Sequence, residues 1–177
     1  MNVWNNKYTT ILADPPWDYQ SIGFHGYKNV PYYDIDSGTQ YKTMTIPEIA
    51  QLPVKEIADN QSHLYLWVTS YFIDAGIIIL NEWRFNFRGI LTWIKKPRLG
   101  MGYYFRNCTE FVLFGVRGNL RTLNRSEPNY FEAPIGRHSE KPDILYTIIE
   151  RNSPPPRVEL FARNTRIGWD FWGNEVK

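Results

Sequence analysis

The chain has 177 residues, of which 43% are hydrophobic and 21% charged, and its formal net charge is +2. This length and composition predict one globular domain, residues 1–177, with a sizeable core. The small net charge does not by itself indicate a nucleic-acid partner. An internal disulfide is excluded because Cys108 is the single cysteine. With no apolar run of about 18 residues and no apolar segment near the start, we expect neither a membrane span nor a signal peptide, and predict a cytoplasmic protein.

The first predicted strand leads into an acid, two prolines and a tryptophan. Residues 11–13 are continuously apolar, which is typical of a strand buried on both faces of a parallel sheet. Pro15 and Pro16 cannot donate to a sheet ladder, so the strand is expected to end at about Asp14. A carboxylate is then held at the carboxyl end of a central strand, where open α/β sheets bind ligands. A surface turn with Trp17 in the core stays open as the alternative.

The rest of the chain alternates between strand and helix patterns. Further strands are predicted over residues 64–68, 85–94, 110–116 and 158–162, with a short extended piece at 131–134. Helices are predicted to begin after a threonine cap at Thr45, over residues 71–82, and from Pro142 to about Arg151. Such alternation indicates a single α/β layer structure.

Two long irregular segments, residues 18–44 and 96–109, interrupt this pattern. Both mix basic with aromatic residues, a combination that can hold phosphates and stack bases. A solvated loop with a few core aromatics is an equally weighted alternative for the second segment. The candidate phosphate contacts are Lys95, Lys96, Arg98 and Arg106.

Asp14-Pro15-Pro16-Trp17 resembles the catalytic tetrad of adenine amino-methyltransferases of the eukaryotic messenger-RNA adenosine methyltransferase type, which have bacterial and phage relatives and use S-adenosylmethionine. Later segments follow in that family's order up to about residue 175. The resemblance implies an α/β, Rossmann-like class I methyltransferase sheet with a circularly permuted motif order and helices on both faces. The short length of the chain, without appended domains, leads us to expect a bacterial or phage enzyme, in the cytoplasm of the bacterial or host cell.

The resemblance also assigns candidate residues to three roles. The catalytic residues are Asp14, Pro15, Pro16 and Trp17. The substrate-binding residues are Tyr41, Glu110 and Lys141, with Lys96, Arg98 and Arg106 added from the second irregular segment. The cofactor-binding residues are Asp14, Lys141, Glu159, Phe161, Arg163, Thr165, Arg166, Asn174 and Glu175. Departures from the family pattern occur at Ala162, where the family has glycine, and at Thr165 and Arg166, where it has histidine and asparagine.

The tetrad suits chemistry on an exocyclic amine, a poor nucleophile because its lone pair is delocalised into the ring. The Asp14 carboxylate can accept one N–H and the Pro15 carbonyl the other, drawing the lone pair back onto nitrogen. Trp17 or Tyr41 can stack on the base.

The resulting expectation is a methyltransferase that acts on adenine in nucleic acid, DNA rather than RNA. An RNA or cytosine-amine methyltransferase and a non-catalytic nucleic-acid-binding partner subunit are the alternatives, and a homodimer or a partner subunit stays open. The histidines His25, His63 and His138 lack metal-ligand spacing, so no metal site is expected. Cys108 is read as a packing residue.

Overall fold

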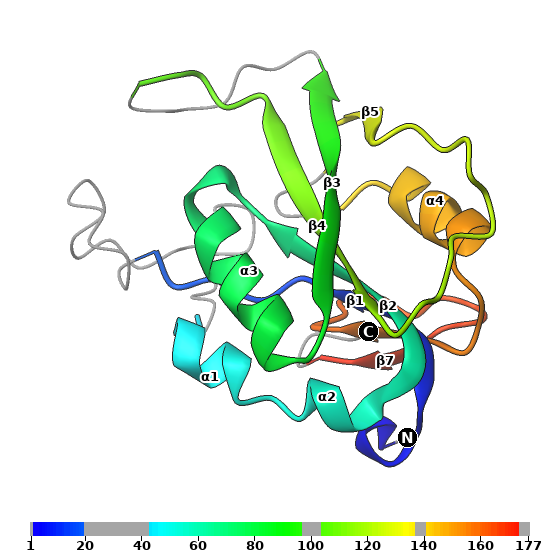
Figure 1. Cartoon of the computed structure of the whole chain (residues 1–177). Coiled ribbons are helices and arrows are strands. Elements are labelled where there is room, and N and C mark those ends of the chain that lie inside the picture. The colour runs from blue at the N-terminus through cyan, green and yellow to red at the C-terminus, as the bar shows by residue number, and fades with distance from the viewer. Residues whose placement is uncertain (1, 20–42, 97–103, 137–140, 174–177) are drawn as a thin grey trace.

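The computed structural model describes residues 2–19, 43–96, 104–136 and 141–173. Its seven strands form one sheet in the order β5-β3-β4-β2-β1-β6-β7 (Figure 1). They are β1 (Tyr8–Ala13), β2 (Ala58–Val68), β3 (Asn86–Lys96), β4 (Thr109–Arg117), β5 (Tyr130–Pro134), β6 (Arg157–Leu160) and β7 (Asp170–Trp172). Strand β4 runs antiparallel to its neighbours β2 and β3, and every other pair is parallel.

Strand β1 lies inside the sheet, as its apolar sequence predicts. Ile11 is level with Leu64 of β2 on one side and with Val158 of β6 on the other. The strand ends at Ala13, immediately before Asp14 and the two prolines. Because β6 comes late in the chain but pairs directly with β1, the expected permuted order of the strands is confirmed.

Helices cover both faces of the sheet, as expected. Ile11 and Ala13 face a core shared with α1 (Ile46–Ala50), α2 (Val54–Ile57) and α3 (Ile73–Glu82). Leu12 faces the opposite core, which is shared with α4 (Ile144–Asn152). Figure 1 shows α3 and α4 on opposite sides of the sheet. The fold is therefore an α/β, Rossmann-like arrangement.

The threonine predicted to cap the first helix does so. The Thr45 hydroxyl accepts a hydrogen bond from the Glu48 N–H, and the Glu48 carboxylate accepts one from the Thr45 N–H. This reciprocal pair satisfies two N–H groups at the helix start. The remaining helical turns, η1 (Val3–Asn5) and η2 (Ser70–Phe72), are single turns. In the described part of the chain, no helix is both long and apolar enough to cross a bilayer.

Some boundaries differ from the prediction. Strand β2 begins at Ala58 rather than at residue 64, and β7 and α2 were not predicted because they are too short to carry a periodic signal. Strand β6 ends at Leu160, short of residue 162, because Phe161 has a φ of 65° and left-handed backbone cannot continue a strand. Just after β7, a Cβ on Gly173 would lie 2.2 Å from the Ala162 carbonyl oxygen, so this contact requires glycine.

The chain reverses its winding at β1. It leaves β1 towards β2 through α1 and α2 on one face, and enters β6 from α4 on the other face. Open α/β sheets bind ligands in the crevice beyond the carboxyl ends of the strands at such a switch point. The crevice between β1 and β6 is therefore the place where the topology expects a ligand, and Asp14 lies at its edge.

Candidate active site

Asp14 and Lys141 are brought together by two distant segments. Asp14 directly follows β1, and its backbone N–H points to the Leu160 carbonyl oxygen of β6 at 3.5 Å. Lys141 lies just before α4, and its Nζ is 3.2 Å from Asp14 Oδ2. Each side chain is 21% exposed. The pair is thus largely shielded from water but still open on one side, as a group that must meet a ligand has to be.

Glu110, at the start of β4, extends this pair into a larger cluster. Its Oε2 lies 3.5 Å from Lys141 Nζ and accepts a hydrogen bond of 2.6 Å from Trp67 Nε1–H. Its Oε1 lies 2.5 Å from Lys95 Nζ. We call Asp14, Lys141, Glu110 and Lys95 the charged cluster; its signs alternate and sum to zero.

Aromatic rings support both cations of the charged cluster. Lys141 Nζ lies 4.5 Å from the centroid of the Trp67 ring, and Lys95 Nζ lies 5.0 Å from that of Trp93. The two indoles meet edge to face. Cation–π contacts of this kind stabilise a desolvated cation by roughly 0.5–2 kcal/mol. The rings therefore fix where the two ammonium groups sit.

The electrostatics of the charged cluster follow from burial and pairing. Burial raises the pKa of Asp14, and the Lys141 ammonium group opposes that rise. Burial alone would raise the pKa of Glu110 too, but the cations of Lys141 and Lys95 outweigh it and hold this pKa below its usual range. For Lys141, burial is outweighed by Asp14 and Glu110, which raise its pKa. The lysine therefore stays charged, and Glu110 is the more firmly ionised of the two acids.

The tetrad holds its shape through backbone hydrogen bonds. The Trp17 N–H donates to the Pro15 carbonyl oxygen at 2.9 Å, and the Met44 N–H donates to that of Pro16 at 2.8 Å. The Pro15 carbonyl is therefore fixed in direction while one of its two lone pairs remains available. Sequence reasoning had foreseen a stiff turn here, but not the strand-like bridge between Trp17 and Met44.

The Trp17 side chain packs in the core, and its stacking on a base stays a prediction. Its side chain is buried, with the residue 7% exposed. One face stacks on Phe72 at 4.9 Å, and its Nε1–H donates to the Trp67 carbonyl oxygen at 3.0 Å. These contacts hold the indole against β2 and η2. Tyr41, the other stacking candidate, lies outside the described residues.

Three of the expected cofactor residues lie at the carboxyl end of β6. Glu159 accepts a hydrogen bond of 2.9 Å from the Tyr146 hydroxyl of α4, and burial raises its pKa to about 7. Phe161 forms the left-handed turn that follows and meets Trp172 edge to face. Arg163 is near enough to act electrostatically on both Asp14 and Lys141.

Two other expected cofactor residues, Thr165 and Arg166, follow shortly after Arg163, and their contact with a cofactor stays a prediction. Thr165 is exposed. Arg166 turns to α4, with its Nε 3.0 Å from Glu150 Oε1 and its NH1 3.5 Å from Asp143 Oδ1. Its guanidinium also lies 4.6 Å from the centroid of the Tyr146 ring. Arg166 therefore ties the segment after β6 to Glu150 of α4 and to Asp143, the residue just before that helix.

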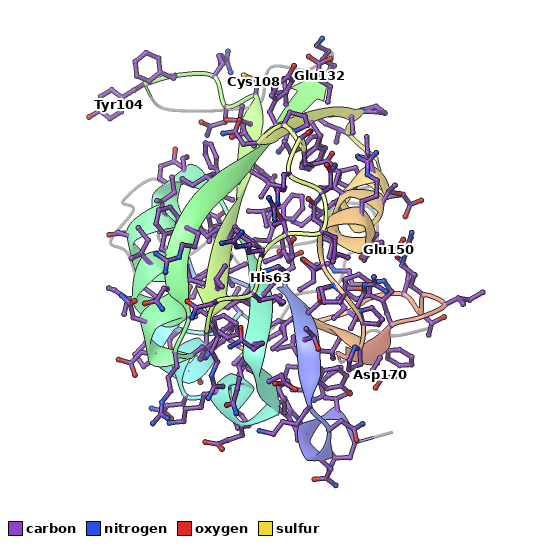
Figure 2. The ribbon with its side chains drawn as sticks, turned by 45° about the vertical axis from the view of Figure 1, so that its right-hand side comes forward. His63, Tyr104, Cys108, Glu132, Glu150 and Asp170 are labelled. Atoms are coloured by element: carbon purple, nitrogen blue, oxygen red, sulfur yellow. The ribbon has the colours of Figure 1, made fainter. Side chains whose placement is uncertain are left out.

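The candidate phosphate contacts separate into two groups. Lys95 turns into the charged cluster, whereas Lys96 is exposed and pairs with Glu132 at 2.6 Å. Arg106 is exposed on the connection between β3 and β4. Figure 2 shows Tyr104, on the same connection, pointing away from the body of the molecule. Arg98 and the expected cofactor residues Asn174 and Glu175 lie outside the described residues.

Sequence reasoning missed two members of the site, Trp67 and the cluster role of Lys95. Trp93 pairs across the strands with Glu110, which makes Lys95 the diagonal neighbour of Glu110 on the same face. In the sequence, the spacing of Trp93 and Lys95 predicts that both side chains lie on one face of a strand. It does not predict that this face carries Glu110, because the register of β3 against β4 cannot be read from the sequence.

The residues at the crevice fit the amino-acid, sulfonium and ribose parts of S-adenosylmethionine, which carry a carboxylate, an ammonium group, a positive sulfur and two hydroxyls. Arg163 can pair with a carboxylate, and Glu159 can accept hydrogen bonds from hydroxyl or ammonium groups. The negative charge of Asp14 can offset the positive charge of a sulfonium. In the described ranges, no group of three or more His, Cys, Asp or Glu side chains could hold a metal ion.

Comparison with known proteins agrees with this geometry. The MT-A70 family model matches residues 8–175. The type II methyltransferase M.MunI of a Mycoplasma species is 31% identical over 96% of this chain and 78% of its own length. The human N(6)-adenosine-methyltransferase catalytic subunit METTL3 is 30% identical over 96% of this chain but only 28% of its own, and a Drosophila melanogaster MT-A70-like protein is 31% identical over 27% of its length. The chain therefore belongs to the MT-A70 family, a family of methyltransferases.

Proposed function

We propose that this protein transfers a methyl group from S-adenosylmethionine to the exocyclic amine of adenine in DNA. The observation that carries the proposal is the Asp14 carboxylate, held by Lys141 at 3.2 Å at the carboxyl end of β1 and followed by the fixed carbonyl of Pro15. Family membership supports the reaction type, since relatives named N(6)-adenosine-methyltransferases match nearly the whole of this chain.

The two acceptors of the tetrad suit an amino group with two N–H bonds. Lys141 contacts Asp14 Oδ2, which leaves Oδ1 to accept one N–H of the amine. The Pro15 carbonyl oxygen, directed by the Trp17 N–H, has a second lone pair for the other N–H. Both hydrogen bonds localise the lone pair on nitrogen. The negative charge of Asp14 also stabilises the positive charge that nitrogen gains as it is methylated.

Arg163, Glu159 and Phe161 would hold the cofactor beyond the end of β6. When bound there, S-adenosylmethionine supplies a methyl group that its sulfonium makes electrophilic. The chain's contribution is positioning: β1 and β6 are adjacent parallel strands, so groups held at their carboxyl ends meet at one edge of the sheet. Fixing two reactants in line in this way accounts for much of the rate of such transfers.

DNA is proposed as the substrate because the chain covers most of the length of one relative, a type II methyltransferase, and a much smaller part of the adenosine-methyltransferases. It matches 78% of a protein named as a type II methyltransferase, a class of DNA methyltransferases, but 28% or less of the two animal adenosine-methyltransferases compared here. If the target base lies in a duplex, it must be flipped out, because its amine is otherwise paired.

Methyl transfer from labelled cofactor to DNA and RNA oligonucleotides tests the proposal. The oligonucleotides are digested afterwards and the labelled nucleoside is identified. We expect label on deoxyadenosine, and none on a DNA in which every adenine is replaced by 2,6-unsubstituted purine. Label on adenosine in RNA alone would mean that the substrate is RNA rather than DNA. Label on a cytosine would refute adenine as the methylated base. Binding of nucleic acid without any transfer would favour a non-catalytic partner subunit.

A further inference from the structure

Lys95 stands at the far end of the charged cluster from Asp14, to which it is linked through Glu110 and Lys141. Its Nζ lies 2.5 Å from Glu110 Oε1, on the side of Glu110 away from Lys141. Its side chain is only 18% exposed. A lysine that served only to attract phosphate would be expected at the surface, as Lys96 is. The geometry of Lys95 therefore needs another explanation.

The register between β3 and β4 places Lys95 beside Glu110. Trp93 of β3 stands opposite Glu110 of β4, and Lys95 follows two residues later on the same face. Long side chains reach such diagonal neighbours. The Lys95 backbone N–H donates to the Cys108 carbonyl oxygen at 2.8 Å, and the Trp93 ring lies under its ammonium group. Backbone and ring together aim the ammonium group at Glu110.

Lys141 lies between two carboxylates, 3.2 Å from Asp14 and 3.5 Å from Glu110. Without another cation, Glu110 would draw Lys141 towards itself, and the remaining three charges would sum to −1. Charges this far from water interact strongly, because the effective dielectric constant is well below that of water. One additional positive charge on the far side of Glu110 removes that competition.

We propose that Lys95 is a positioning residue for methyl transfer: by neutralising Glu110, it leaves Lys141 to hold the Asp14 carboxylate in place and keep it ionised. The proposal rests on the proposed function, since it assigns Asp14 the role of accepting the amine N–H. Lys95 itself touches no reactant. It acts through Glu110 and Lys141.

The activity test uses Lys95→Met, Lys95→Arg and, as a matched control, Lys55→Met, which changes an exposed lysine of α2. A displacement of about 1 Å at a reacting group costs about 100-fold in rate, so we expect kcat of Lys95→Met to fall roughly 10- to 100-fold. Lys95→Arg keeps the positive charge and should retain most of the wild-type activity. Lys55→Met should match the wild type.

The pH profile separates positioning from a purely structural role. Asp14 is faced by Lys141, Glu110 and Arg163, and by Glu159 and Tyr146 from β6 and α4. An opposite charge within about 4–6 Å lowers a carboxyl pKa by roughly 1–3 units, so losing Lys95 makes the two acids of the charged cluster easier to protonate. The acid limb of kcat should therefore move up by about one pH unit in Lys95→Met. A folded Lys95→Met with the wild-type kcat and acid limb would overturn the proposal.

A double variant covers the case in which Lys95→Met fails to fold. Lys95→Met combined with Glu110→Gln leaves no uncompensated carboxylate. If Lys95 acts through Glu110, the double variant should be no slower than Glu110→Gln alone. Rate losses that multiply independently would refute this route.

A titration without substrate distinguishes this proposal from the proposed function. The Glu110 carboxyl is followed by carbon-13 NMR in the wild type and in Lys95→Met. We expect its titration midpoint to rise by about one pH unit in the variant. An unchanged midpoint refutes the role of Lys95 whether or not the enzyme methylates adenine. Conversely, a wild type that transfers no methyl group refutes the function, while the NMR result still decides whether Lys95 holds the charge of Glu110.

Discussion

Two polar clusters lie on the same face of β2, and they differ in charge and in access to solvent. Trp67 points into the charged cluster at the carboxyl end of the strand. Tyr65 and His63, two and four residues earlier, point into a neutral cluster with Ser153. The Ser153 hydroxyl lies 2.7 Å from both the His63 Nδ1 and the Tyr65 hydroxyl, and His63 Nε2 lies 3.1 Å from the Leu120 carbonyl oxygen.

The neutral cluster, His63, Tyr65 and Ser153, is sealed. Ser153 and His63 are 0% exposed, and Figure 2 shows His63 within the body of the molecule. A serine hydroxyl on a histidine nitrogen resembles a nucleophile with its base, but both His63 nitrogens are occupied and no substrate can reach them. The charged cluster remains partly open and ends on the Asp14 carboxylate, whose contact with Lys141 among the described residues is made by Oδ2. Access, more than residue type, separates the reactive cluster from the structural one.

The largest expected effect comes from the open cluster. Asp14→Asn keeps the shape of the side chain but removes its charge and one N–H acceptor. Loss of a preorganised electrostatic group costs about 100- to 1,000-fold in kcat, so turnover should fall by at least that much. Calorimetry on the same sample should show cofactor binding largely retained. The matched control is Asp59→Asn, near the opposite end of β2, and near-normal turnover of Asp14→Asn would remove the mechanism proposed here.

Breaking the sealed cluster should do the reverse. Ser153→Ala leaves the His63 nitrogen and the Tyr65 hydroxyl without their shared partner. An unsatisfied buried polar group costs about 1–3 kcal/mol, so the free energy of unfolding should fall by that amount while kcat stays the same. Urea denaturation and turnover, measured together, check both halves. A drop in kcat without loss of stability would mean that this cluster belongs to the active site after all.

The pH dependence of stability sharpens the contrast. Burial lowers the pKa of His63 below its ordinary value of 6.5. The unfolded chain therefore takes up this proton first as the pH falls, so the stabilisation by His63 is complete above about pH 6.5 and is lost below it. The unfolding free energies of wild type and His63→Gln should converge between pH 7 and pH 5, by at most about 1.4 kcal/mol per pH unit. A constant gap would show that His63 keeps its proton affinity in the fold.

The smallest effect is expected at the exposed ion pair. Lys96 and Glu132 lie 2.6 Å apart, closer than Lys141 lies to either of its carboxylates, but their side chains are 63% and 47% exposed. Exposed pairs contribute about 0–1 kcal/mol, so Glu132→Gln should change the free energy of unfolding by no more than that. Thermal unfolding at low and high salt measures it. A loss comparable to that of Ser153→Ala would mean that solvent access does not set the strength of these pairs.

The sequence by itself determined the elements whose signals are local. The prolines after Asp14 end β1, Thr45 and Glu48 cap α1, and apolar spacing marks α3 and α4. The tetrad and the later motifs identified the family and placed Asp14, Glu110 and Lys141 in the site. These features depend on backbone restrictions and on residue types a few positions apart, which the chain carries wherever it folds.

The partner that each side chain takes depends on how distant segments pack against one another. Lys95 and Lys96 are neighbours in the sequence, yet the register of β3 against β4 turns one into the charged cluster and leaves the other in water. Arg166 takes its partners from Asp143 and from Glu150 of α4, and Trp17 stacks on Phe72, which lies 55 residues later in the chain. Partner choice depends on distances between segments far apart in the chain. Strand pairing and helix packing set those distances, and no local pattern encodes them.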